Sequence, residues 1–342
     1  MKQPIIMDVD TGIDDSLALL YLLASPEADI LAITCTSGNV PAQQVATNNL
    51  AWLDLCGAPE IEVALGSEVP IVAPLMTTEE THGPQGIGYA VLPAPTRTLS
   101  PRHATEVWVE LARSRPGDIV GLVTGPLTNL ALALRIEPEL PRLLKRLVVM
   151  GGAFDHPGNT LPTTEWNIAV DPESAKIVFD AFSGLPAARR PIICALDVTE
   201  QIEMRPHHIA KIAELAGSSP AEIIAEEDID GTLSTASNRV VRYLSDAVRF
   251  YMEFHVSHNQ GFLAHMHDPF AAAIALHPEF GTTRPATVDV ELAGTLTRGQ
   301  TVADWAGLWG REPNADIVVA VDPPQFFDHL VERVGDFARR IG

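Results

Sequence analysis

The chain has 342 residues, of which 44 are acidic and 23 are basic, giving a formal net charge of −21. This length allows a large buried core, and α/β chains of this size often form one domain. Because such a negative surface repels phosphate backbones, we expect no nucleic-acid partner, whereas a neutral small molecule is compatible with it.

Short apolar runs alternate with helical patterns through the first 200 residues. The expected strands are 5–9, 30–36, 61–65, 119–123, 147–150 and 192–196. The expected helices are 15–24, 41–56, 103–114, 128–135 and 172–182. Residues 66–100 are rich in Pro, Gly and Thr, which predicts a long functional loop. This alternation is typical of βαβ units in a mostly parallel sheet.

The second half of the chain is richer in helices. Its helical patterns cover 206–216, 219–226, 238–258, 267–276 and 324–340. Residues 286–302 alternate like a β-hairpin, and 317–321 form an expected last strand. Since the sequence contains no linker or repeat, we expect a single α/β domain over residues 1–342. Its mostly parallel central sheet is flanked by helices, with extra helices in the C-terminal half.

The cysteines and apolar runs bear on the compartment. Cys35, Cys56 and Cys194 are odd in number and widely spaced, which predicts reduced, buried thiols in a cytoplasmic protein rather than a disulfide framework. No signal peptide is visible at the start of the sequence. The apolar runs are too short to span a bilayer, so we expect no membrane partner.

Four carboxylates occur within eight residues, at Asp8, Asp10, Asp14 and Asp15. They stand between an expected buried strand and an apolar helix, and no Lys or Arg follows them before Arg97. Desolvating an unpaired carboxylate costs several kcal/mol, so this segment requires a counter-charge from elsewhere. A hard divalent cation supplies one, since calcium and magnesium prefer carboxylate oxygens.

Helix capping is a simpler interpretation of some of these acids. Negative charge at a helix N-terminus contributes about 0.3–1 kcal/mol, which accounts for Asp14 and Asp15 but not for Asp8 and Asp10. The role of Asp8 stays open. Asp268 precedes a proline at the start of an apolar helix, so capping applies to it as well. The neighbouring His267 favours a site, because a carboxylate can bind metal while an imidazole donates a proton near neutral pH.

Further polar groups follow the expected strands. Asn39, Thr124 and Met150 come directly after strand carboxyl ends, the edge at which open α/β sheets bind ligands. The segment 159–167 contains two amides and one carboxylate around Trp166. It fits either a polar loop with Asx turns or a clamp for sugar hydroxyls.

The remaining histidines give weaker signals. His82 stands alone in the loop 81–88, where a single histidine is usually a surface residue. His255, His258 and His265 have no zinc-like spacing, and we interpret them as structural.

Taken together, these segments resemble the inosine-uridine-preferring nucleoside hydrolase family. The resemblance runs from Ile5 to about Pro278, and its most specific part is 8–15. The other matching segments are 37–39, 124–129, 149–152, 165–167, 171–173 and 267–269. The resemblance implies an enzyme that hydrolyses the N-glycosidic bond of ribonucleosides to free base and ribose, in purine or pyrimidine salvage, with a tightly bound calcium ion.

The resemblance also implies roles for individual residues. Calcium would be bound by the carboxylates of Asp10, Asp15 and Asp268 and by the backbone carbonyl of Thr124. Asp10 would also be the general base for the calcium-bound water. The ribose would meet Asp14 and Asn167 at its 2′ hydroxyl, Asp268 at its 3′ hydroxyl, Asn159 and Glu165 at its 5′ hydroxyl, and Asn39 and Met150 along the pocket. His267 is the expected acid for the leaving base, with His82 as the second candidate.

The sequence departs from the family pattern at two places. Trp166 stands where phenylalanine is common, and Pro84-Gln85 where an acidic or small polar residue is frequent. The loop 66–100 and the region 225–265 are expected to set the base preference, to which Tyr251 is a candidate contributor.

Two other functions compete with this one. Asp8 and Asp10 also fit the nucleophile and acid of a haloacid-dehalogenase-like phosphatase, although the later lysine and paired acids of that family have no clear counterpart. A non-catalytic protein that binds a nucleoside or sugar is the second alternative. By analogy with the family, we expect a homodimer or homotetramer.

Overall fold

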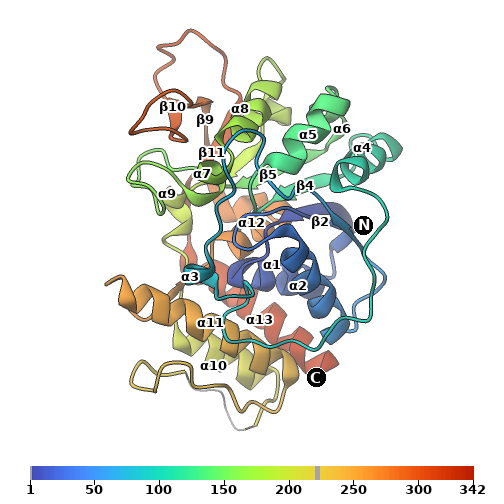
Figure 1. Cartoon of the computed structure of the whole chain (residues 1–342), viewed down its shortest axis with the longest axis vertical. Helices are drawn as coiled ribbons and strands as arrows, with labels where there is room; N and C mark the ends of the chain where they lie inside the picture. The colour runs from blue at the N-terminus through green and yellow to red at the C-terminus, as the bar shows by residue number, and fades with distance from the viewer. Residues whose placement is uncertain (1, 220–223) are drawn as a thin grey trace.

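The computed structural model describes residues 2–219 and 224–342. Nine strands of this part of the chain form one sheet. They are β1 (Gln3–Val9), β2 (Ala28–Cys35), β3 (Glu62–Leu65), β4 (Val120–Val123), β5 (Arg146–Met150), β6 (Ile192–Cys194), β9 (Gly281–Val290), β10 (Thr301–Asp304) and β11 (Ala315–Val321) (Figure 1). Their order in the sheet is β10-β9-β11-β6-β5-β4-β1-β2-β3.

The sheet is mostly parallel, as the alternation in the sequence predicts. All pairings from β3 across to β6 and on to β11 are parallel. The antiparallel strands are β9 and β10, which form the hairpin expected over 286–302 and join the sheet through β11. The carboxyl ends of β1, β2, β4 and β5 therefore meet at one edge.

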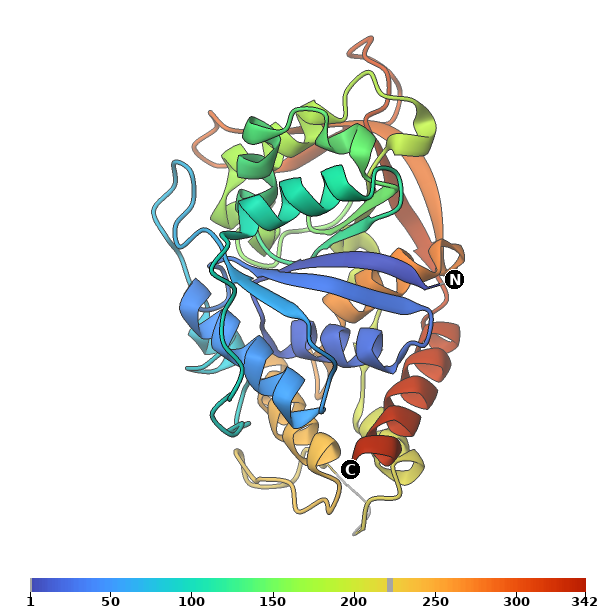
Figure 2. The ribbon, with the colours of Figure 1, turned by 90° about the vertical axis from the view of Figure 1, so that its right-hand side faces the viewer.

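Helices cover both faces of this sheet (Figure 2). The longer ones are α1 (Ile13–Ala24), α2 (Ala42–Leu55), α4 (Ala104–Ser114), α5 (Thr128–Ile136), α8 (Pro172–Ala181), α10 (Pro206–Leu215), α11 (Arg239–Ser257), α12 (His267–Leu276) and α13 (Pro323–Ile341). Alternate residues of β1 enter different cores, because side chains of a strand point to opposite faces. Ile5 and Met7 pack with α1, α11 and α12, while Ile6 packs with α4 and α5.

Several short elements were not predicted. They are α3 (Glu79–His82), α6 (Leu140–Leu143), α7 (Trp166–Val170), α9 (Leu196–Thr199) and a two-stranded sheet of β7 (Glu203–Met204) and β8 (Ala264–His265). Each has fewer residues than a sequence pattern needs to show a period. The helix expected over 219–226 includes residues 220–223, which lie outside the described residues, and 224–226 are not helical.

The cysteines and the apolar character of the helices bear on two expectations from the sequence. Cys35, Cys56 and Cys194 are buried and free, as the spacing of the cysteines predicts. Within residues 2–219 and 224–342, no helix has both the length and the apolar character needed to cross a bilayer.

Candidate active site

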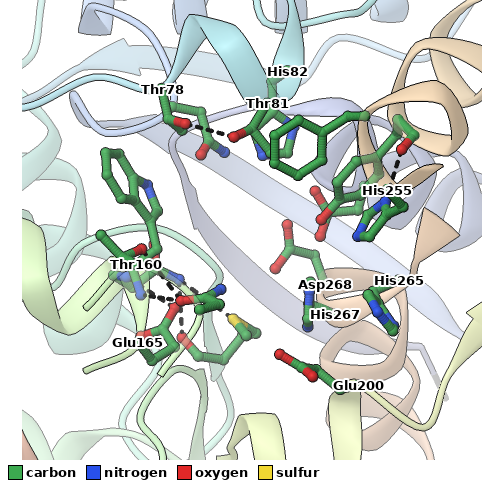
Figure 3. A pocket seen from close by; sticks show the side chains of 18 of the residues that line it. Thr78, Thr81, His82, Thr160, Glu165, Glu200, His255, His265, His267 and Asp268 are labelled. Atoms are coloured by element: carbon green, nitrogen blue, oxygen red, sulfur yellow. Dashed lines mark hydrogen bonds between the residues drawn. The ribbon is translucent and has the colours of Figure 1, made fainter. Parts of the chain in front are cut away.

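A cavity of about 400 Å³ opens at the carboxyl edge of the sheet (Figure 3). This volume falls within the usual range for small-molecule sites. The predicted residues that line it are Asp14, Asn39, His82, Thr124, Met150, Asn159, Glu165, Asn167, His267 and Asp268. They come from segments spread over more than 250 residues, and the parallel strands bring them together because their carboxyl ends share one edge.

A group of buried carboxylates forms the acidic end of the cavity. Carboxylate oxygens of Asp14, Asp15 and Asp268 lie within 4.8 Å of one another, and Asp10 interacts with this group. Burial, followed by the charge of Asp15, raises the pKa of Asp14 to about 7. Burial and the neighbouring acids also raise the pKa values of Asp10 and Asp268 well above their usual range. The group therefore repels itself unless a cation or protons neutralise it.

The two carboxylate oxygens of Asp10 differ in their hydrogen bonding. Its Oδ2 accepts a hydrogen bond from the Asn39 backbone N–H at 2.9 Å, and Gly38 allows this approach because a Cβ there would overlap the carboxylate. Its Oδ1 is buried and has no hydrogen-bond partner among the described residues. An orphaned carboxylate oxygen beside three further acids fits a hard cation, which takes six to eight oxygen ligands.

Asp15 fits both interpretations of the acidic segment, helix capping and cation binding. One oxygen accepts from the backbone N–H of Gly12, the N-cap of α1, at 2.7 Å, and the other accepts from the Thr124 hydroxyl at 2.7 Å. It therefore caps α1 and belongs to the acidic group at the same time. The closest triad contains Asp14 in place of the predicted Asp10.

The 159–167 segment is also both a capped loop and a wall of the cavity. Glu165 is the N-cap of α7 and accepts from the backbone N–H groups of Gly152 at 3.0 Å, Asn167 at 2.9 Å and Ile168 at 3.1 Å. Burial raises the pKa of Glu165 to about 6, and these hydrogen bonds oppose the rise. The Asn167 amide donates to the backbone carbonyls of Thr124 at 2.8 Å and Met150 at 3.2 Å. Glu165 and Asn167 are thereby held rigidly against the strand ends.

The imidazoles of His82 and His267, both predicted site residues, also line the cavity (Figure 3). The backbone N–H of Ile13 donates to His82 Nδ1 at 3.1 Å, so the proton of the neutral ring sits on Nε2. Burial lowers the pKa of His82 to about 3, which keeps it neutral near pH 7. His267 Nδ1 lies 2.8 Å from the Thr199 hydroxyl, and burial also lowers the pKa of His267.

His255, His258 and His265, which their spacing led us to interpret as structural, lie beside the predicted site residues. They line the cavity together with His156, Glu200 and Tyr251. One signal was present in the sequence: positions 251 and 255 are four apart, which places them on one face of α11. Only tertiary packing brings α9 and β8 to this cavity, and no local sequence pattern indicates it.

Asp8, whose role the sequence left open, points away from the cavity. Its Oδ2 accepts from the Thr34 hydroxyl at 2.6 Å and from the Trp108 indole at 2.7 Å, and its Oδ1 accepts from Asn129 at 3.2 Å. It is fully buried and does not line the cavity. This arrangement contradicts the phosphatase hypothesis, which requires Asp8 as an accessible nucleophile.

We expect Asp8→Ala to lower the free energy of unfolding by about 3 kcal/mol, because it leaves three buried donors without their acceptor. Asp8→Asn keeps one acceptor oxygen and should lose less, with kcat within tenfold of wild type. Urea denaturation of the three proteins measures the difference. Equal stability of both variants and wild type would show that this hydrogen-bond network contributes nothing.

This sheet, with an acidic cavity at its carboxyl edge, belongs to an N-ribosyl hydrolase. The chain belongs to the family described as inosine-uridine preferring nucleoside hydrolase, whose pattern matches residues 5–328. The chain is therefore a ribonucleoside hydrolase, as the resemblance in the sequence implies, and the hypothesis of a non-catalytic binding protein falls.

Two named relatives and one solved structure match this chain over 99% of its length. It is 36% identical to the pyrimidine-specific ribonucleoside hydrolase RihA of Citrobacter koseri, over 99% of this chain and 100% of the relative. The RihA protein of Salmonella paratyphi C is 38% identical with the same coverage. The structure of a purine-preferring ribonucleoside hydrolase from Gardnerella vaginalis superposes with a TM-score of 0.87, at 30% identity, over 99% of this chain and 100% of the other.

Proposed function

We propose that this chain cleaves the N-glycosidic bond of ribonucleosides with one bound calcium ion, and that Asp10 is the general base. The observation that carries the proposal is the buried Asp10 Oδ1, which lacks a partner among the described residues beside Asp14, Asp15 and Asp268. The carboxylates of Asp10, Asp15 and Asp268 and the Thr124 carbonyl would hold the ion. When bound, calcium keeps these carboxylates ionised and makes a nearby water more acidic.

The other residues position the ribose. Asp14 and Asn167 would hydrogen-bond its 2′ hydroxyl, and Asp268 its 3′ hydroxyl. Asn159 and Glu165 would hold the 5′ hydroxyl, and Asn39 and Met150 would line the sugar. This assignment is supported by the lining of the cavity and by the backbone contacts that fix Glu165 and Asn167.

The reaction needs one proton acceptor and one proton donor. Water forms a bond to C1′ and gives its proton to Asp10, while the bond from C1′ to the base nitrogen breaks. The ribose gains oxocarbenium character, which the surrounding carboxylates stabilise. The departing base would take a proton from His267, with His82, whose Nε2 carries hydrogen, as the alternative donor. Burial lowers the pKa of both rings, so the donor gives up the N–H proton of a neutral ring and regains a proton from solvent afterwards.

Pyrimidine ribonucleosides are the first substrates to test, because the RihA relatives that match over the whole chain are named pyrimidine-specific. The experiment is a panel of uridine, cytidine, inosine and adenosine, with calcium or with a chelator, scored for free ribose. We expect ribose release that requires calcium, and no hydrolysis of an aryl phosphate. Binding of these nucleosides without ribose release would contradict the proposal.

A further inference from the structure

One wall of the cavity is built from residues to which the proposed reaction gives no role. It consists of His156, Glu200, His255, His258 and His265, and we call it the acceptor wall. Three of its members are labelled in Figure 3: His255 and His265 lie across the cavity from Glu165 and Thr160, and Glu200 lies below His267. His255 and His265 therefore lie away from the groups proposed for the 5′ hydroxyl. His265 borders His267, with ring centroids 5.6 Å apart, on the side proposed for the base.

Hydrogen bonds to the backbone fix the proton on three imidazoles of the acceptor wall. His255 Nδ1 lies 2.7 Å from the Tyr251 carbonyl, His156 Nδ1 2.9 Å from the Pro157 carbonyl and His258 Nδ1 2.9 Å from the Phe254 carbonyl. A carbonyl only accepts, so each Nδ1 donates. Each neutral ring therefore presents a lone pair at Nε2, which is the reverse of His82.

Glu200 adds a carboxylate to these lone pairs. Its Oε2 lies 3.6 Å from His156 Nε2, which is too far for a hydrogen bond. When His156 is neutral both atoms are acceptors, and a donor nitrogen about 3 Å from each can bridge them. The Glu200 side chain is 23% exposed, so a ligand in the cavity can reach it.

We propose that the acceptor wall selects ribonucleosides whose base carries an exocyclic amino group, such as cytidine or adenosine, over their oxo counterparts, uridine and inosine. An amino group supplies two N–H donors, which suits a wall of lone pairs and one carboxylate. An oxo group at the same position sets its own lone pairs against them, and leaves the base a single N–H donor on the neighbouring ring nitrogen in place of the two N–H donors of the amino group. This difference in donor number and position lets the wall discriminate between the two bases. This inference rests on the proposed ribonucleoside hydrolysis.

The test compares kcat/KM for cytidine with uridine, and for adenosine with inosine, on calcium-loaded wild-type protein. Each pair differs in the amino or oxo group and in the neighbouring ring nitrogen, which accepts in cytidine and adenosine and carries hydrogen in uridine and inosine. The assays are run at pH 8, above the range in which free imidazoles titrate. We expect the amino substrate of the better-cleaved pair to be favoured by about tenfold or more. An oxo substrate cleaved as well or better would overturn the inference while leaving the hydrolase function intact.

Variants separate recognition from a general loss of activity. Glu200→Gln replaces one of the two acceptor oxygens by an NH2 donor and removes the negative charge, so the amino-to-oxo ratio should fall by about tenfold, mostly through the amino substrate. His255→Phe removes a second acceptor and should lower the same ratio. The matched control is Glu214→Gln, because Glu214 is exposed on α10 and paired with Lys211 outside the cavity, and its ratio should stay as in wild type.

Two outcomes of these experiments count against the inference. Equal losses for amino and oxo substrates in both Glu200→Gln and His255→Phe, in variants that melt like wild type, would show that the wall does not distinguish amino from oxo bases. Release of ribose from none of the four nucleosides would contradict the proposed function itself, and this inference would fall with it.

Discussion

Replacing Asp10 with alanine is expected to lower kcat for a ribonucleoside by about three to four orders of magnitude, because general-base catalysis contributes about 10²–10⁴-fold and Asp10 is also a proposed calcium ligand. The change removes the buried Oδ1 that has no other partner in the described structure. Single-turnover release of ribose measures the loss without interference from product release.

Asp10→Asn is the control that keeps the shape of the site. Its amide can still accept from the Asn39 backbone N–H, but it cannot take a proton from water. We expect this variant to fold normally and to lose nearly as much activity as the alanine variant. Turnover within tenfold of wild type in either variant, with wild-type melting behaviour, would sink Asp10 as the base.

Removing calcium is expected to abolish turnover and to make the stability of the protein depend on pH. Without the ion, the folded-state pKa of Asp14 is raised from 3.8 to about 7, and those of Asp10 and Asp268 are raised as well. A raised carboxyl pKa gives stability that is present below about pH 4 and is lost as the pH rises through about 7. The metal-free protein should therefore melt at a lower temperature at pH 8 than at pH 5.

The calcium-loaded protein should not show this loss. Calcium at 100 times its Kd adds about 2.7 kcal/mol to the free energy of unfolding, provided that it binds only the folded state. The gap in Tm between calcium-loaded and chelator-treated samples should therefore widen from pH 5 to pH 8. Melting curves at both pH values, followed by recovery of activity when calcium is restored, check both parts. A Tm that calcium changes at neither pH would contradict a metal among these carboxylates.

The site residues that could be predicted from the sequence lie either in one continuous segment or at the carboxyl ends of strands. Asp10, Asp14 and Asp15 come just after β1, Asn39 and Thr124 follow β2 and β4, and Met150 is the last residue of β5. Parallel strands fix where such residues meet, so the residues of the acidic end could be predicted without knowing any loop conformation.

The acceptor wall could not be predicted in this way. His156 and Glu200 follow the ends of β5 and β6 at some distance, while His265 belongs to a strand of two residues. Only the packing of α11 against β8 brings His255 onto His265, with ring centroids 4.8 Å apart. Asp8 shows the same limit, because its partner Trp108 is 100 residues away in α4.

The most direct test is a crystal structure of the wild-type protein grown with calcium, with anomalous data that identify the ion. We predict a single peak bound by the carboxylates of Asp10, Asp15 and Asp268 and by the Thr124 carbonyl, at about 2.3–2.6 Å from each oxygen. An empty acidic cavity at saturating calcium, or an ion held without Asp10, would contradict the account.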